Sequence, residues 1–337
     1  MKLLKIVKRF FRQIISLEKP VSMLPMALLL RMAPRLAKSR PLELYPGWYF
    51  NCGWHTKNPI TLLRRQIWAR CYQSDKLRAV VIKWYNGLKI ELSLGDDISQ
   101  CLFIDGCIEP NEFVFLSKVI QPGMVFIDGG ANIGLYTLFA SKKVGPHGLV
   151  VAVEPSQREF DHLQRNLQLN NLANVKLLQT ALSNRGGFAT LQIAEWEHGG
   201  QNTLGNFVYP DIDSSHSVQV TLSRLDDLVK AAGLQQVDII KLDVEGAEFS
   251  ALDGARHILT TYYPLLLIEF SDAALRLQGS SAKEVKTLLA TLGYTIYTFD
   301  SISGLPVKAG ESCELSNNIV AVHPIRMWAE LNANDQN

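Results

Sequence analysis

One short segment, MVFIDGGANIG at residues 124–134, limits the folds open to this chain more than any other. Its apolar start predicts a buried strand, and its glycines break that strand before helical spacing resumes in LYTLFASKKV. Glycine permits backbone conformations and close approaches that a Cβ prevents, and a helix N-terminus presents free N–H groups. Strand, turn and helix together predict a backbone cradle for a ligand at one edge of a parallel sheet.

An acidic residue after the next strand indicates that the ligand is a nucleoside. Glu154 follows LVVAV at residues 149–153, and a carboxylate placed there can accept hydrogen bonds from ribose hydroxyls. Asp128, at the tip of the first strand, would repel a diphosphate but attract a cationic amino-acid group. The turn reads D-x-G-x-N-x-G and does not match the dinucleotide pattern G-x-G-x-x-G. These features favour S-adenosylmethionine over NAD.

Three blocks of sequence resemble the FkbM family of S-adenosylmethionine-dependent methyltransferases. They are VFIDGGANIGLYTLFA, AVEPSQREFDHLQRNLQLNN and DIIKLDVEGAEFSALDGA, within roughly residues 105–275, and DVEGAE is the most specific. The resemblance implies a class I methyltransferase fold and, most often, methyl transfer to a hydroxyl oxygen of a sugar or natural product. Gly129 departs from the family, which commonly has a hydrophobic residue there; we expect tolerance because that side chain would pack beneath the turn. The expected cofactor-binding residues are Asp128, Gly130, Ala131, Asn132, Gly134 and Glu154.

The rest of this region predicts an α/β fold with a Rossmann-like, seven-stranded, mostly parallel sheet and helices on both faces. Strands are expected at 124–128, 149–153, 175–179, 237–242 and 264–269, and two later ones in GYTIYTFDS and NNIVAVHP. Helices are expected near 134–143, 157–170, 223–232, 246–260 and 282–292. Residues 195–217 interrupt this alternation with a long polar, Gly-rich loop, and such loops in compact domains are usually functional or disordered.

The charge of the chain is uneven. Residues 1–40 contain ten Lys or Arg and one Glu, a local charge of +9, so the rest of this +2 chain totals 2 − 9 = −7. We therefore expect no nucleic-acid binding by the main domain. Residues 2–17 predict a basic amphipathic helix, which either contacts a membrane surface through residues 1–17 or packs on the protein.

An apolar stretch near the N-terminus and the cysteines bear on the compartment of the protein. The apolar stretch VSMLPMALLLRMA is too short to span a bilayer, and five cysteines without a C-x-x-C pair favour a reducing compartment. We expect a cytoplasmic protein, with peripheral membrane contact as an open alternative; the oligomeric state is not determined. The four expected parts are a basic helical segment (1–40), an aromatic-rich subdomain (41–110), a methyltransferase domain (111–325) and a tail (326–337).

The 41–110 part contains a predicted β-hairpin in RAVVIKWYNGLKIELSL, with Asn86-Gly87 suited to a type I′ turn. It also holds four of the six tryptophans: Trp48, Trp54, Trp68 and Trp84. Two interpretations stay open for them, a wall that stacks on carbohydrate and the core of a small subdomain. The lead-in GCIEPNEFVFLSKVI predicts a helix just before the first nucleotide-binding strand.

Methyl transfer from a sulfonium is an in-line displacement, and some group must take the hydroxyl proton. The candidates lie at strand ends or in the long loop: Asp243, Glu245, Glu269 and His198. An alternative is that the DVEGAE carboxylates cap helices or pair with Lys241 or Arg256. The three acids also offer enough oxygens for a divalent metal, but loosely placed carboxylates are poor evidence for one.

The predicted function is methylation of a hydroxyl on a saccharide or related metabolite. One alternative is a nicotinamide oxidoreductase on a similar sheet, which the missing glycine at Asn132 disfavours. Another is a non-catalytic member that serves as an interaction module at a membrane-associated assembly. The intact acids of the cofactor site disfavour that alternative.

Overall fold

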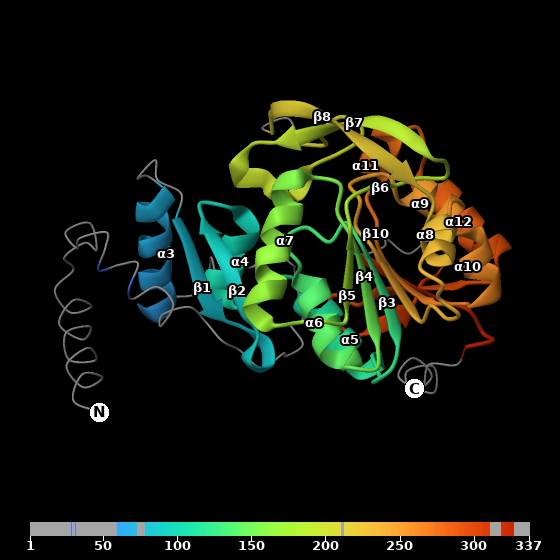
Figure 1. The fold of residues 1–337 in the computed structure, drawn as a ribbon, viewed down its shortest axis with the longest axis horizontal. Helices are drawn as coiled ribbons and strands as arrows, with labels where there is room; N and C mark the ends of the chain where they lie inside the picture. Colours follow the sequence, from blue (N-terminus) through green and yellow to red (C-terminus); the bar gives the residue numbers. More distant parts are fainter. Residues whose placement is uncertain are drawn as a thin grey trace. The chain divides into compact units, whose positions relative to one another are not determined.

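The computed structural model describes residues 59–72, 78–209, 212–310 and 318–326, together with Leu28 and Arg31. The amphipathic helix predicted over 2–17, most of the 326–337 tail, and Trp48 and Trp54 lie outside these residues. The chain divides into two compact units (Figure 1). Among the described residues, the first unit ends at Ile108 and the second begins at Glu109.

The first unit contains α3 (Pro59–Tyr72), β1 (Arg78–Lys83), β2 (Lys89–Leu94) and α4 (Asp97–Asp105). The two strands pair antiparallel from Arg78↔Leu94 to Lys83↔Lys89, which confirms the hairpin. Its turn, η2 (Tyr85–Gly87), places Asn86 at φ 47° and Gly87 at φ 81°. Positive φ at both central residues is what a type I′ turn requires.

The two described tryptophans of this unit are core residues. Trp68 and Trp84 are 4% and 3% exposed. The Trp68 ring centroid lies 6.1 Å from that of Phe103, and Trp84 Nε1 donates to the carbonyl oxygen of Gly106 at 3.1 Å. An indole buried in this way cannot stack on carbohydrate, so for these two residues the structure favours the core interpretation.

The second unit is built on one eight-stranded sheet with the order β12-β11-β13-β10-β9-β3-β4-β5. The strands are β3 (Val125–Gly129), β4 (Leu149–Val153), β5 (Val175–Leu178), β9 (Ile239–Leu242), β10 (Leu265–Glu269), β11 (Thr295–Phe299), β12 (Pro306–Lys308) and β13 (Asn318–Val322). Neighbours from β10 to β5 are parallel, whereas β13 pairs antiparallel with both β10 and β11. The α/β class I arrangement is confirmed.

The predicted number of strands was one too few. The additional strand is β12, which pairs with β11 at the edge of the sheet through only three residues. So short a segment has too few residues to show an alternating pattern, which is why the sequence did not reveal it. Strands β3 and β9 are buried along their whole length, in agreement with the continuous apolar runs that predicted them.

Helices cover both faces of this sheet. They are α5 (Pro110–Val119), α6 (Leu135–Val144), α7 (Gln157–Asn170), α8 (Leu225–Ala231), α9 (Glu248–Asp253), α10 (Arg256–Thr261), α11 (Asp272–Leu277) and α12 (Ala282–Thr291). Figure 1 shows α6 and α7 on one side of the sheet and α8, α10 and α12 on the other.

The single helix predicted over 246–260 is wrong, because two helices, α9 and α10, occupy it. They separate at Gly254, where an added Cβ would lie 2.1 Å from the carbonyl oxygen of Ser183. The helix therefore breaks where Gly254 packs against the backbone of Ser183, and glycine also has a low helix propensity.

The prediction of one long loop over 195–217 is wrong, because part of this segment belongs to a second, three-stranded sheet. It consists of β6 (Ala181–Leu182), β7 (Gly187–Ala194) and β8 (Ser214–Ser223), in the order β6-β8-β7. The end of the predicted loop belongs to β8, and its beginning forms the 3₁₀ helix η3 (Trp196–Gln201). The Ser- and His-rich start of β8 is exposed, so its sequence lacks the apolar alternation of a half-buried strand.

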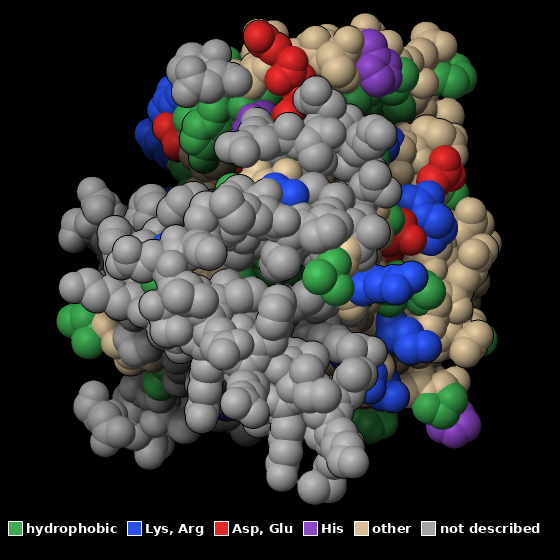
Figure 2. Space-filling view, turned by 90° about the vertical axis from the view of Figure 1, so that its left-hand side faces the viewer, with side chains coloured by type: hydrophobic (Ala, Val, Ile, Leu, Met, Phe, Trp, Pro, Cys, Tyr) green, Lys and Arg blue, Asp and Glu red, His purple; other side chains and the backbone are tan. Residues whose placement is uncertain are grey.

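The described surface is mixed in character. In Figure 2, Lys and Arg side chains occur on the same face as Asp, Glu and hydrophobic side chains. Within the described part of the chain, no helix combines the length and the apolar character needed to cross a bilayer.

Candidate active site

The sequence order of the strands reverses between β3 and β9, and this brings two turns together. Asp128 pairs with Lys241 and Gly129 with Leu242 across the parallel ladder. Beyond the last pair, the Asp243 N–H donates to the carbonyl oxygen of Gly129 at 3.1 Å. The glycine turn after β3 and the DVEGAE turn after β9 therefore lie side by side at the edge where open α/β sheets bind ligands.

The glycine turn requires its glycines for two different reasons. Gly130 has φ 74°, and a Cβ there would lie 1.7 Å from the carbonyl oxygen of Asp243. Gly134 has φ 96°, and its Cβ would lie 2.2 Å from Leu163 Cδ1. Both the left-handed conformation and the close approach therefore exclude other residues at these positions.

Gly129, the departure from the family pattern, lies over a filled space. A Cβ there would be 2.7 Å from Leu182 Cδ1 and 2.9 Å from Leu242 Cδ2. These two leucines occupy the space beneath the turn, where a hydrophobic side chain at position 129 was expected to pack.

Asn132 and Glu154 connect the glycine turn to β4. Asn132 adopts φ 49°, and its backbone N–H donates to Glu154 Oε2 at 2.8 Å. The other oxygen of Glu154 accepts from the Ser156 N–H at 2.9 Å. Burial and the charge of Glu159 raise the pKa of Glu154 to about 8. Glu154 thus holds the turn in shape and places a carboxyl group where a ribose is expected.

Asp128 is fully buried beneath the turn. Its Oδ2 accepts from Thr137 Oγ1 at 2.6 Å, and its Oδ1 lies 3.8 Å from Lys241 Nζ. Burial raises the pKa of Asp128, and the Lys241 charge and the Thr137 hydrogen bond oppose that rise. This location allows Asp128 to act on a ligand through its charge and its support of the turn.

Lys241 links the two turns. Its Nζ lies 3.0 Å from Asp243 Oδ2, donates to the carbonyl oxygen of Gly130 at 3.3 Å, and lies 4.8 Å from the ring centroid of Tyr136. Burial alone would lower the pKa of Lys241, but the charges of Asp243, Asp128 and Glu109 raise it above its ordinary value. The sequence named Lys241 only as a pairing partner, and the structure makes it the buried cation of the site.

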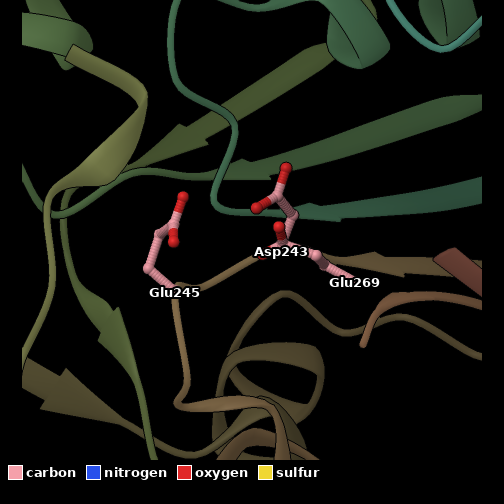
Figure 3. Close-up of side chains that lie close together, drawn as sticks. All are labelled: Asp243, Glu245 and Glu269. Carbon is pink, nitrogen blue, oxygen red and sulfur yellow. The ribbon is translucent and has the colours of Figure 1, made fainter. Parts of the chain in front are cut away.

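The structure brings Asp243, Glu245 and Glu269 together. Oxygens of the three carboxylates lie within 4.8 Å of one another. In Figure 3, the carboxylates of Asp243 and Glu245 extend from one connection and Glu269 lies beside Asp243. Burial and the charge of Asp243 raise the pKa of Glu245 well above its ordinary value, and burial and the charge of Glu245 do the same for Glu269. A raised pKa makes a carboxylate a stronger proton acceptor.

The spacing of these oxygens would also suit a divalent cation. Two of the carboxylates already have partners, however: the Lys241 ammonium group contacts Asp243, and the Gln201 amide donates to Glu245 Oε1 at 3.1 Å. A cation here would compete with Lys241. We assign no metal to the site.

Glu248, the last acid of DVEGAE, has a structural role. Its Oε1 accepts from the N–H groups of Val244 and Gly246 at 3.0 and 3.2 Å. Burial raises the pKa of Glu248 to about 7. Its two partners lie in the turn before α9, so Glu248 holds that turn in shape. Arg256 pairs with Asp253, 2.7 Å away, and not with a DVEGAE carboxylate.

The segment Glu195–Gly205, here called the 195–205 segment, contacts both turns. The Asn132 side-chain amide donates to the Gly199 carbonyl oxygen at 3.2 Å, and Gln201 reaches Glu245. His198 lies in this segment, but its ring is not within the 4.8 Å carboxylate group. The participation of His198 in the reaction stays a prediction.

Glu109 is a site residue that the sequence did not single out. It has φ 52° and precedes Pro110 at the start of α5. Its Oε2 accepts from Tyr136 Oη at 2.6 Å and its Oε1 from Asn318 Nδ2 at 2.7 Å. Burial and the charge of Asp243 raise the pKa of Glu109. A Glu-Pro pair opening a helix was the available signal, since proline favours the first helical position.

The residues around the glycine turn fit the expected S-adenosylmethionine. Gly130 and Gly134 let the turn pack closely against Asp243 and Leu163, and α6 begins directly after them, so the turn and the helix start form one backbone surface. Acidic groups surround this surface, as suits a ligand that carries an ammonium and a sulfonium charge. A helix N-terminus alone would also suit a diphosphate, but the acidic groups would repel one.

Comparison with known proteins agrees with this geometry. The model of the Methyltransferase FkbM domain matches residues 128–296, half of the chain. Methyltransferase 1 of Beauveria bassiana (strain ARSEF 2860) is 28% identical over 214 residues, which cover 59% of this chain and 80% of that protein. The 2-O-methyltransferase NoeI of Sinorhizobium fredii (strain NBRC 101917 / NGR234) is 26% identical over 190 residues, 51% of this chain and 76% of that protein.

Among solved structures, the crystal structure of methyltransferase FkbM from Methylobacillus flagellatus KT is 16% identical, with a TM-score of 0.38. The similarity covers 67% of this chain and 55% of that one. The fold class follows independently from the strand order described above. On the strength of the matching domain, the chain belongs to the FkbM family of S-adenosylmethionine-dependent methyltransferases.

Proposed function

We propose that this methyltransferase acts on a hydroxyl oxygen of a saccharide or a related polyhydroxylated metabolite. The observation that carries the proposal is the convergence of Asp243, Glu245 and Glu269 beside the glycine turn. S-adenosylmethionine supplies an electrophilic methyl group when bound. The residues that would hold it are Asp128, Gly130, Ala131, Asn132, Gly134 and Glu154.

Glu245 is our candidate for the base that takes the hydroxyl proton. Burial and the charge of Asp243 raise the pKa of Glu245, which makes its carboxylate a stronger proton acceptor. It lies on the turn directly after Asp243, next to the glycine turn. A hydroxyl placed against this carboxylate loses its proton to it as the oxygen attacks.

Asp243 and Glu269 support this role in different ways. Asp243 is paired with Lys241, so one of its oxygens is already engaged by a cation. Glu269 shares a hydrogen bond with Asp243 and has a raised pKa. Asp243 is therefore suited to orient a hydroxyl, and Glu269 is the second candidate for the base.

Two further observations support a sugar-like oxygen acceptor. The relative NoeI is named a 2-O-methyltransferase. Trp196, in the 195–205 segment, is 39% exposed, and the Arg158 guanidinium carbon lies 5.6 Å from its ring centroid. An exposed indole held against an arginine offers an apolar face for the C–H groups of a sugar ring.

The test is transfer of an isotopically labelled methyl group from S-adenosylmethionine to a panel of neutral saccharides and hydroxylated metabolites. We expect turnover on at least one hydroxyl acceptor and a loss of about 100-fold or more in kcat for Glu245→Gln. Glu195→Gln is the matched control, since Glu195 is exposed in the same segment. Each variant should bind S-adenosylhomocysteine as the wild type does.

Two results would count against the proposal. Methylation of amine or thiol acceptors with none at hydroxyls would contradict the oxygen assignment. Equal kcat for Glu245→Gln and wild type would remove Glu245 as the base, and Glu269→Gln would then be tested in the same assay.

A further inference from the structure

Glu245 adopts a backbone conformation that glutamate rarely takes. Its φ is 50°, in the left-handed region, and Gly246 follows with φ 100°. A non-glycine residue in this region costs about 1–3 kcal/mol and persists only where its surroundings hold it. The contacts that hold Glu245 therefore show which residues the site depends on.

Two side chains distant in sequence hold its backbone. The Glu245 carbonyl oxygen accepts from Thr203 Oγ1 at 2.9 Å and from Gln278 Nε2 at 2.6 Å. Gln278 Nε2 also donates to Thr203 Oγ1 at 3.1 Å, which closes a three-membered hydrogen-bonded ring. Because Nε2 carries two hydrogens, it can make both bonds at once.

A third side chain holds the carboxylate itself. Gln201 Nε2 donates to Glu245 Oε1 at 3.1 Å. This bond restricts rotation of the carboxylate about its last torsion, which otherwise has a broad range. With Oε1 engaged by the amide, Oε2 is the oxygen available to an acceptor hydroxyl.

The 195–205 segment that carries Gln201 and Thr203 is itself anchored. Gln192 and Thr203 exchange backbone hydrogen bonds of 2.8 and 3.1 Å, which fastens the segment to β7. At its end, Gly205 packs so closely that an added Cβ would lie 2.8 Å from Gln278 Cγ. The segment therefore offers its donors from a fixed frame, as precise positioning of a reacting group requires.

We propose that Gln201 is a positioning residue for the Glu245 carboxylate, and that Thr203 and Gln278 hold the Glu245 backbone so that this bond can form. The proposal rests on the proposed function, in which Glu245 takes the proton of the acceptor hydroxyl. Gln201 acts through Glu245 and is assigned no contact with the reacting atoms. A site that requires this arrangement loses rate when the donor is removed, even though every carboxylate remains.

Kinetics of three variants test the role in turnover. Gln201→Leu keeps the bulk and removes the donor; we expect kcat to fall about 10- to 100-fold, as for loss of a hydrogen bond to a charged group. The dissociation constant for S-adenosylhomocysteine should stay within about twofold, because the cofactor residues are unchanged. Thr203→Val should also lower kcat, whereas Thr203→Ser, which keeps the hydroxyl, should restore it. Gln219→Leu, at an exposed position on β8, is the matched control.

A double-mutant cycle tests the bond without requiring turnover. Unfolding constants are measured for wild type, Gln201→Leu, Glu245→Leu and the double variant, because leucine removes the acceptor oxygen that glutamine would keep. We expect the effects to be non-additive by about fivefold or more, because the two side chains interact directly. This coupling in a protein that methylates no hydroxyl would uphold the contact and refute the proposed function.

Additive effects in the cycle would overturn the inference. So would a kcat of Gln201→Leu equal to that of the control, or an equal loss of kcat in Thr203→Ser and Thr203→Val. A weakened affinity for S-adenosylhomocysteine with unchanged kcat would likewise overturn it, by assigning Gln201 to the cofactor.

Discussion

Replacing Lys241 by methionine tests how the acidic site is held together. The substitution keeps an unbranched chain of similar length and removes the buried cation. Lys241 Nζ lies 3.8 Å from Asp128 Oδ1 and 3.0 Å from Asp243 Oδ2. Asp128 is fully buried, whereas the Asp243 side chain is 32% exposed and can be solvated by water after the change.

The expected loss of stability comes chiefly from Asp128. Removing one partner of a buried ion pair costs about 3–5 kcal/mol, and the exposed part of Asp243 keeps its own share small. We therefore expect the free energy of unfolding to fall by about 3–4 kcal/mol near pH 8. In a unit of this size, that is a fall in Tm of roughly 10 °C.

The loss of stability in Lys241→Met should depend on pH in a definite direction. Burial raises the pKa of Asp128 above its unfolded value, and loss of the Lys241 charge raises it further. An acid whose folded pKa is raised contributes stability below its unfolded pKa, and loses that contribution as pH rises through the folded value. The deficit of Lys241→Met should therefore grow from pH 5 to pH 8, by at most about 1.4 kcal/mol per pH unit.

The assay is denaturant unfolding of wild type and Lys241→Met at several pH values. Lys283→Met, at an exposed position on α12, is the control and should change stability by less than about 0.5 kcal/mol. Asp128→Asn in the Lys241→Met background should recover part of the loss, since it removes the buried charge. A deficit below about 1 kcal/mol at pH 8, or one that does not vary with pH, would refute the reasoning.

Three other predictions follow from the site. Because the pKa of Glu154 is about 8 and its ionised form accepts hydrogen bonds from hydroxyls, affinity for S-adenosylhomocysteine should rise from pH 6 to 8; calorimetry should show no such rise in Glu154→Gln, and an identical slope would contradict this. Gly130→Ala should lower Tm far more than Gly129→Ala, because a Cβ at Gly130 meets backbone 1.7 Å away and one at Gly129 first meets leucine side chains; equal Tm values would contradict it. Trp196→Ala should raise the KM for a saccharide acceptor by about tenfold and leave binding of S-adenosylhomocysteine unchanged, and an unchanged KM would remove Trp196 from the acceptor site.

The elements predicted well are those whose signal is local and strong. Helix α7 begins and ends where 157–170 was expected, and β4 matches 149–153. The central parallel strands are buried on both faces and therefore appear as apolar runs in the sequence. The hairpin was found from Asn86-Gly87, because few residues accept two successive positive φ values.

The elements missed have weak or misleading local patterns. Strand β12 is too short to show a period, and the start of β8 is exposed and polar. The break at Gly254 lies inside a helical pattern, at a point where the carbonyl of Ser183 approaches closely. At Gly254 the contact comes from a segment distant in the chain.

The candidate site shows the same division. Asp243, Glu245 and Glu269 were expected because each lies at or just after the end of a predicted strand, and parallel strands end at one edge. Gln201, Thr203 and Gln278 belong to no motif, so nothing in the sequence connected them to Glu245. The carboxyl group of Glu109 could likewise be placed only once Tyr136 and Asn318 were located.

By itself, the sequence determined that a strand ends in a glycine turn with acids at neighbouring strand ends, and it thereby indicated the cofactor. A few adjacent residues suffice for this, since φ preferences and strand order are properties of local sequence and of right-handed crossover connections. Only the tertiary structure decided which acids are paired, which are buried with a raised pKa, and which donors hold Glu245. Burial and charge depend on groups that folding brings within a few ångströms, and those groups lie far apart in the chain.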